Sequence, residues 1–158
     1  MATNDMNLRL KLGFLYSAAG KFQEARDAAN YVLDHQPQDD EAPLLLAEAS
    51  LKPKEVEAAR QRLQTLIRSG DRAALEVAVG NLFFREHNLT NAETAFRRAQ
   101  TLDPKSSAVN VALGTLSWAQ NDLKSAAAGF KAAAEASSVR SPRRMQYCLL
   151  YTSDAADE

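Results

Sequence analysis

Residues 73–106 read AALEVAVGNLFFREHNLTNAETAFRRAQTLDPKS. Two runs of helix-forming residues flank a polar turn at His87 and Asn88, and Pro104 follows the second run. Proline ends a helix because it lacks a backbone N–H and its ring clashes with the preceding turn. The segment therefore predicts two short helices joined by a turn.

Similar segments lie before and after this one at a fixed spacing. Three kinds of position recur at steps of 34, 33 and 34 residues: a small residue in the first helix, an apolar residue after the turn and an alanine in the second helix. These positions are Gly13, Ala47, Gly80 and Gly114; Phe22, Val56, Leu89 and Leu123; and Ala25, Ala59, Ala92 and Ala126. A period of about 20–50 residues indicates a protein built from stacked repeats.

The repeated unit resembles the tetratricopeptide repeat (TPR). That family's pattern has Leu-Gly and an aromatic residue in the first helix, then alanine, an aromatic residue and alanine in the second, with proline near the end. The third unit has these features at Val79-Gly80, Phe83, Ala92, Phe96, Ala99 and Pro104, and the second unit has the fewest of them. The resemblance implies an all-α fold, a right-handed α-solenoid of antiparallel helix pairs with about four repeats.

The repeats set the expected boundaries. One array covers residues 6–140, with units at residues 6–39, 40–72, 73–106 and 107–140. Its helices are expected at residues 6–19, 22–35, 40–51, 55–68, 73–86, 91–102, 106–120 and 123–136.

Packing and turns can also be predicted from the repeated positions. Glycine inside a helix costs about 0.5–1 kcal/mol relative to alanine, so the repeated glycines predict close approach of the two helices in a unit. Large side chains should then fill the space within and between pairs, namely Leu12, Tyr16, Phe22, Phe96 and Phe130. The equivalent turn positions hold residues that tolerate left-handed backbone, Gly20, His87 and Asn121. Thr90 and Glu93 have capping-box spacing for the start of a second helix.

The C-terminal segment departs from the repeat. Residues 141–147 look like the start of a truncated fifth unit. Residues 148–158, CLLYTSDAADE, resemble a translated sequencing-library adapter. We expect the natural protein to diverge near Cys148 and continue with more repeats; a native acidic tail is the alternative.

Composition excludes several classes of function. The formal net charge is −1, without a basic excess for nucleic acid. No window reaches the roughly 18 apolar residues that suggest a membrane span, and the N-terminus lacks a secretory pattern. The default expectation is a cytoplasmic location, unless the true N-terminus is missing. The single Cys148 excludes an internal disulfide and a thiolate-rich metal site.

No residues have the spacing of a catalytic or metal site. His35 and His87 are the only histidines, and neither has a partner at metal-ligand spacing. The chain has neither a glycine-rich phosphate loop nor a G-x-S-x-G motif, and no paired carboxylates in an apolar frame. We therefore expect no enzyme activity, no cofactor and no metal.

The concave surface is the candidate binding site. In TPR arrays the first helices line an inner groove that takes an extended peptide or a helix. The residues proposed to bind a partner there are Phe14, Leu44, Glu48, Asn81, Phe84, Arg85, Thr115 and Trp118, with Leu10, Val77 and Val111 at the same helical phases. Of the Lys, Asn and Arg set with which some TPR domains clamp a terminal carboxylate, only Asn81 has a counterpart. Packing against neighbouring repeats is the alternative role for each residue.

The sequence thus favours a non-catalytic scaffold that binds another protein or a peptide. One alternative is the repeat region of a larger enzyme or of an envelope or polysaccharide-export protein whose active part is absent from this chain. The other is self-association through uncapped ends, because the last complete helix offers Ala126, Phe130 and Ala133 as an apolar face.

Overall fold

A computed structural model of the chain describes residues 2–137. Over this range it contains eight α-helices and no strand: α1 (Ala2–Ala18), α2 (Phe22–His35), α3 (Glu41–Ala49), α4 (Pro53–Ser69), α5 (Ala73–Arg85), α6 (Leu89–Leu102), α7 (Ser107–Ala119) and α8 (Leu123–Ala136). The predicted all-α fold is confirmed. The predictions for residues 141–147 and 148–158 lie outside the described residues.

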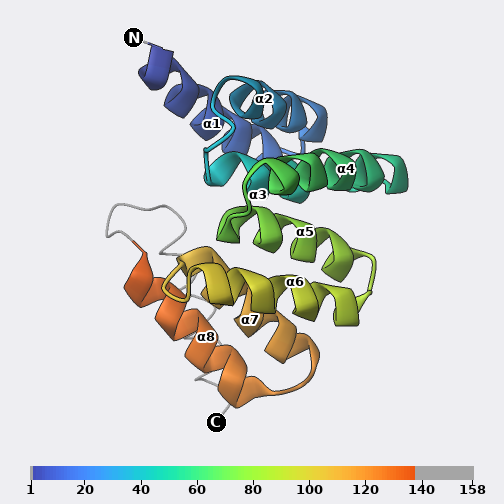
Figure 1. The fold of residues 1–158 in the computed structure, drawn as a ribbon, viewed down its shortest axis with the longest axis vertical. Helices are drawn as coiled ribbons and strands as arrows, with labels where there is room; N and C mark the ends of the chain where they lie inside the picture. Colours follow the sequence, from blue (N-terminus) through green and yellow to red (C-terminus); the bar gives the residue numbers. More distant parts are fainter. Residues whose placement is uncertain (1, 138–158) are drawn as a thin grey trace.

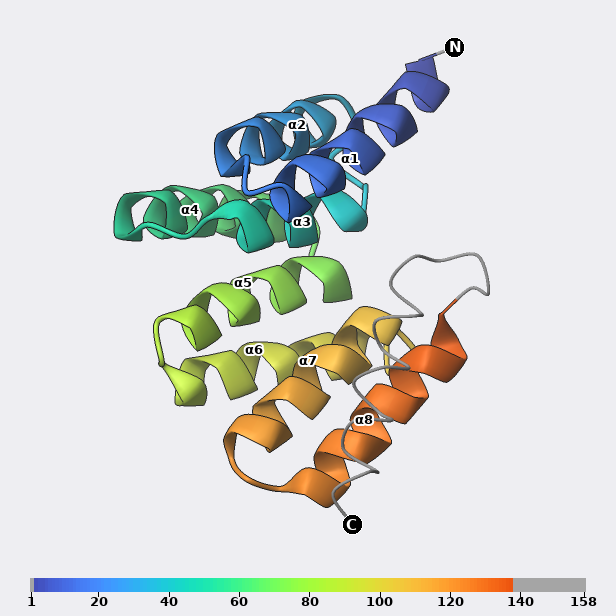
Figure 2. The same cartoon turned by 180° about the vertical axis from the view of Figure 1, so that it is seen from behind.

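The helices form a stack that follows the order of the chain. It runs from α1 and α2 at the top of Figure 1 to α7 and α8 at the bottom, and Figure 2 shows the same order from behind. The pairs α1–α2, α5–α6 and α7–α8 are closely packed, and α1, α3, α5 and α7 each contact the next member of this series. One core of buried side chains therefore extends through several pairs.

The predicted close approach occurs at the repeated glycines. A Cβ atom on Gly114 would lie 3.0 Å from ring carbons of Phe130 and 3.2 Å from the carbonyl oxygen of Ala126. A Cβ atom on Gly13 would lie 2.6 Å from Cδ2 of Leu45. No larger side chain fits at these positions while the helices keep this distance.

The expected large side chains fill this space, with one exception. Phe96 and Phe130 are fully buried, and Tyr16 and Phe22 are half-buried against the core. The prediction for Leu12 is wrong, because 42% of its side chain is exposed. Leu12 lies on the outer side of α1, where no described helix precedes it.

The turns confirm the backbone prediction. Gly20, His87 and Asn121 have φ angles of 75°, 59° and 62°, and no other described residue has a left-handed φ. The predicted capping box at Thr90 is wrong. Helix α6 begins earlier, and the side chain of Asn88 caps it by accepting a hydrogen bond of 3.2 Å from the backbone N–H of Asn91. Asn88 occupies the N-cap because a side-chain oxygen there satisfies a free helix N–H.

The second pair departs from the pattern of the others. Helices α3 and α4 were predicted at residues 40–51 and 55–68, but α3 ends at Ala49 and α4 begins at Pro53. Proline disfavours helical backbone in the residue before it and is well suited to the first position of a helix, so Pro53 ends one helix early and starts the next early. As a result α3 touches α4 only sparsely and packs instead against α2 and α5.

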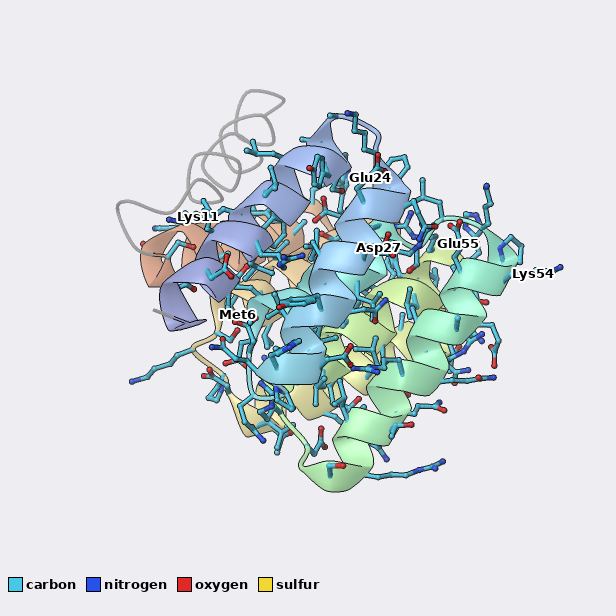
Figure 3. The ribbon with its side chains drawn as sticks, turned by 90° about the horizontal axis from the view of Figure 1, so that it is seen from above. Met6, Lys11, Glu24, Asp27, Lys54 and Glu55 are labelled. Atoms are coloured by element: carbon cyan, nitrogen blue, oxygen red, sulfur yellow. The ribbon has the colours of Figure 1, made fainter. Side chains whose placement is uncertain are left out.

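Side chains hold this irregular connection together. The carboxylate of Glu55 accepts hydrogen bonds of 3.1 Å and 3.0 Å from the backbone N–H groups of Leu51 and Lys52. Arg26 of α2 lies 3.0 Å from the Glu55 carboxylate and donates a 2.8 Å hydrogen bond to the carbonyl of Ala49. Glu55 lies at the start of α4, beside α2, in Figure 3. The guanidinium of Arg26 therefore ties the end of α3 to the beginning of α4.

The predicted exposed apolar face at the C-terminal end is not found. Ala126, Phe130 and Ala133 are all buried. Phe130 is directed toward Gly114 of α7, the partner of α8 in its own pair, and Ala133 clusters with Ala134 and Val111. These side chains belong to the core of the last pair.

Candidate functional site

A groove of about 690 Å³ runs across the first helices of the last three pairs. It is lined from α3, α5 and α7 and from the turn between α5 and α6. Its lining residues are Leu44, Glu48, Val77, Asn81, Phe84, Arg85, His87, Leu89, Ala108, Val111, Ala112, Thr115 and Ala119. We refer to this set as the inner groove.

The floor of the inner groove is apolar. Leu44, Val77 and Val111 occupy equivalent positions of α3, α5 and α7, since they are 33 and 34 residues apart. Ala108 and Ala112 of α7 lie beside them. Because these alanines are small, the groove keeps its depth between α5 and α7.

Asn81 places a free polar group in the middle of the groove. It is half-buried on α5, and its side-chain amide makes no hydrogen bond to another described residue. An amide both donates and accepts hydrogen bonds, as a peptide group does. Thr115, at the equivalent position of α7, adds a hydroxyl group to the same lining. The groove therefore offers hydrogen-bonding groups beside an apolar floor.

The charged residues of the groove are linked to each other and to α1. Ser17 of α1 donates a 2.9 Å hydrogen bond to the carboxylate of Glu48. Arg85 of α5 approaches the carbonyl oxygen of Glu48, with Nη2 3.4 Å away. Both Glu48 and Arg85 are exposed, so a negative and a positive group stand near each other at one edge of the groove.

Two family models, each described as tetratricopeptide repeat, match residues 7–77 and residues 77–140. The chain belongs to the tetratricopeptide repeat family. No curated protein matches it.

Solved TPR structures have the same fold. A tetratricopeptide repeat protein from Parabacteroides merdae matches 95% of this chain and 57% of its own length, with a TM-score of 0.67 and 16% identity. A thermophilic TPR protein from Thermus thermophilus matches 96% of this chain and 99% of its own, with a TM-score of 0.57 and 19% identity. A chain of the APC/C hetero-tetramer Cut9–Hcn1 matches 96% of this chain and 30% of its own, with a TM-score of 0.68 and 16% identity. At such low identities these matches show the fold alone, and this TPR chain spans little more than half of the first and less than a third of the last.

The structure brings together six of the eight predicted site residues. Those that line the inner groove are Leu44, Glu48, Asn81, Phe84, Arg85 and Thr115. Phe14 lies on α1, half-buried against the core, and Trp118 lies near the end of α7 with 53% of its side chain exposed. Neither is part of the groove lining, although Trp118 has the position in α7 that Phe84 has in α5, 34 residues earlier.

The prediction missed several lining residues. These are His87, Leu89, Ala108, Ala112 and Ala119. The three alanines follow the helical spacing i, i+4 and i+11 on the face that also carries Thr115, so helical periodicity alone would have found them. His87 and Leu89 come from the turn, which periodicity does not place.

The described part of this TPR chain holds no metal-binding cluster. Within residues 2–137 no three His, Cys, Asp or Glu side chains are grouped closely enough to hold a metal ion. His35 stacks on Tyr31, with ring centroids 4.2 Å apart, and its Nδ1 lies 2.8 Å from the Tyr31 carbonyl oxygen. No helix in this range is long and apolar enough to cross a membrane.

Proposed function

We propose that this TPR chain is a non-catalytic scaffold that binds a peptide segment or a helix of another protein in the inner groove. TPR repeats generally mediate protein–protein interactions, and their fold is typically a non-catalytic interaction scaffold. The observation that carries the proposal is the inner groove itself, with its apolar floor on α3, α5 and α7 and the unpaired amide of Asn81.

The groove has the chemistry for a partner with apolar side chains and free backbone groups. Leu44, Val77 and Val111 provide an apolar surface on which such side chains would be removed from water. The amide of Asn81 would hydrogen-bond the partner's backbone, and this contact would favour an extended peptide, because a helix already uses its own backbone groups. Phe84, half-buried at the rim, is an aromatic anchor of the kind enriched among residues that dominate binding energy.

The charged edge adds a directional contact. Since Glu48 is already hydrogen-bonded to Ser17, its carboxylate is held in place before a partner arrives. Arg85 makes one long hydrogen bond and keeps most of its donors for a ligand. We propose that Arg85 pairs with an acidic or carbonyl group of the partner, and that Phe14 and Trp118 extend the binding surface beyond the groove.

The test uses peptides selected for binding. A random peptide library is panned against the immobilised chain, and the affinity of an enriched peptide is measured with purified variants. We expect Asn81→Ala to weaken binding about two- to tenfold, the net effect of one hydrogen bond. The matched control is Asn91→Ala, which removes an exposed asparagine of α6 outside the groove and should leave affinity unchanged.

A second matched pair tests the apolar contact. Phe84 lines the groove, whereas its neighbour Phe83 lies under the guanidinium of Arg60 from α4, 5.1 Å from the ring centroid. Phe84→Ala should weaken binding more than Phe83→Ala, with the free energy of unfolding measured for both. Equal affinities for all four variants would mean that the selected peptide binds elsewhere, and the proposal would fail.

A further inference from the structure

The outer face of α1 carries a stripe of exposed leucines. The exposed fractions of Leu8, Leu12 and Leu15 are 66%, 42% and 65%. Their spacing of four and three residues places them on one side of the helix. We refer to these three residues as the α1 stripe. Figure 3 looks down on this end of the molecule, where α1 lies beside α2.

The repeat shows what normally covers these positions. Residues 34, 67 or 68, and 101 positions further on occupy the same phases of α3, α5 and α7. They are Ala42, Leu46 and Ala49; Leu75, Val79 and Leu82; and Val109, Leu113 and Leu116. Eight of these nine are buried, with exposed fractions of 0–6%, and Leu113 is partly buried against the core.

A preceding helix provides this cover in each of the three cases. Helix α2 packs on α3, α4 on α5, and α6 on α7. Short connections join the members of each pair, so they run antiparallel. Among residues 2–137 nothing precedes α1 in this way. The complement of the α1 stripe is therefore the apolar face of another helix that runs antiparallel to α1.

A second copy of the chain presents such a face. The other large apolar side chains that are exposed in the described range are Leu51, Leu102, Trp118 and Leu123, and they are spread over four different elements. The α1 stripe is thus the one place in residues 2–137 where three such side chains share a helix face. A two-fold interface joins the same patch on both subunits, and it would make the two α1 helices antiparallel.

We propose that the chain self-associates as a two-fold symmetric dimer through the α1 stripe. The stripe is nearly symmetric about Leu12, so an antiparallel pair places Leu12 beside its own copy at the symmetry axis and Leu8 opposite Leu15 of the second copy. Each stripe supplies the apolar cover that α2, α4 and α6 supply within the chain. The stripe is not part of the inner groove lining, so this dimer and the proposed peptide binding are independent.

The position of Lys11 predicts how the dimer responds to charge. Lys11 is exposed, lies beside the stripe and points away from α2 in Figure 3. A two-fold axis near Leu12 brings Lys11 next to Lys11 of the second copy, on the same side of the helix pair. These like charges repel each other, and salt screens such a repulsion. The dimer is therefore expected to be weak at low ionic strength and tighter at high ionic strength.

The first experiment is sedimentation equilibrium of the full chain over a range of concentrations. We expect reversible association to twice the chain mass. Leu8→Glu combined with Leu15→Glu should raise the dimer dissociation constant at least about tenfold, since it places charges in an apolar contact. The matched control is Leu102→Glu, which changes a leucine of 47% exposure on α6 and should leave the dimer intact. Circular dichroism of each variant confirms that the helices remain.

A chain that stays monomeric at millimolar concentration would overturn the proposal and leave a helix of another protein as the occupant of the stripe. So would a dimer that survives the double substitution.

The second experiment tests the symmetry and does not alter the leucines. In a two-fold dimer, Lys11→Glu replaces one repulsive pair by another, but an equimolar mixture with the unaltered chain pairs Lys11 with a glutamate. We expect the mixed dimer to be about fivefold tighter than either homodimer at low salt, since an exposed pair is worth up to about 1 kcal/mol. A mixture that associates no more tightly than its components would show that α1 does not lie across a symmetry axis, and the proposed geometry would fail.

Discussion

Gly80 and Phe96 are closer to each other than any other glycine and side chain in the described range. A Cβ atom on Gly80 would lie 2.3 Å from Cε1 and 2.5 Å from Cδ1 of the Phe96 ring. The ring is fully buried between α5 and its neighbours, so it has no free space into which to move. This contact sets the distance between α5 and α6, and α5 supplies the centre of the inner groove.

Gly80→Ala is therefore expected to destabilise the chain. Alanine favours a helix by about 1 kcal/mol over glycine, but overpacking a buried ring costs about 1–3 kcal/mol, so the net loss should be about 1–2 kcal/mol. Urea unfolding followed by circular dichroism measures it. The matched control is Gly70→Ala, where an added Cβ would meet nothing within 4 Å. A Gly80→Ala variant as stable as the original chain would show that the ring can move aside.

Gly20→Ala isolates the effect of backbone conformation. Neither Gly20 nor Gly70 has an atom within 4 Å of an added Cβ, but Gly20 has φ of 75° and Gly70 has an extended φ of 161°. A left-handed backbone costs a residue with a Cβ about 1–2 kcal/mol. Gly20→Ala should thus lower the free energy of unfolding by about that amount relative to Gly70→Ala. Equal stabilities of the two variants would contradict this explanation.

The regular parts of the fold follow from the period of the sequence. The spacing of Gly13, Gly80 and Gly114 predicted the close helix pairs, and the turn position predicted the left-handed backbone of His87 and Asn121. The second pair was predicted less well, because there the repeat and the local chemistry disagree. Alignment places Val56 at the start of α4, but Pro53 starts the helix three residues earlier.

The candidate site was predictable to a similar degree. Helical phase placed Asn81, Phe84 and Thr115 on one surface, because each phase is repeated from pair to pair. The exposure of Leu12 was not predictable in this way. Its phase is the one that Leu46 and Val79 bury, and whether it is covered depends on a neighbouring helix rather than on Leu12 itself.

Glu76 predicts a dependence of stability on pH. Its side chain lies on α5 with only 4% exposed, and Arg98 is 3.7 Å away but largely in solvent. Burial, reinforced by the negative charge of Asp71, raises the pKa of the Glu76 carboxyl above its usual range, and Arg98 offsets this only in part. Stability from the protonated carboxyl is present below the unfolded-state pKa and is lost as the pH rises through the higher folded-state pKa.

Glu76→Gln removes this titration, because the amide stays neutral. The variant should gain stability relative to the original chain as the pH rises from about 4 to 7, with the largest gain at pH 7. Urea unfolding at several pH values checks this. Glu24→Gln, at an exposed position of α2 that is labelled in Figure 3, should stay within about 0.5 kcal/mol of the original chain at pH 7. A Glu76→Gln variant that is less stable than the original chain at pH 7 would mean that the pair with Arg98 outweighs the burial of the carboxylate.

Trp118→Ala separates binding from packing at the end of α7. Because 53% of the Trp118 side chain is exposed, its truncation should lower the free energy of unfolding by about 1 kcal/mol or less and leave the helical circular dichroism unchanged. Exposed tryptophans are frequent anchors in protein interfaces, so the affinity for a groove-selected peptide that reaches past Ala119 should fall about tenfold or more. Leu102→Ala, at 47% exposure on α6 and outside the inner groove, is the matched control and should not alter affinity. If Trp118→Ala lowers stability and affinity by the same free energy, Trp118 is a packing residue, and the binding surface ends with the groove.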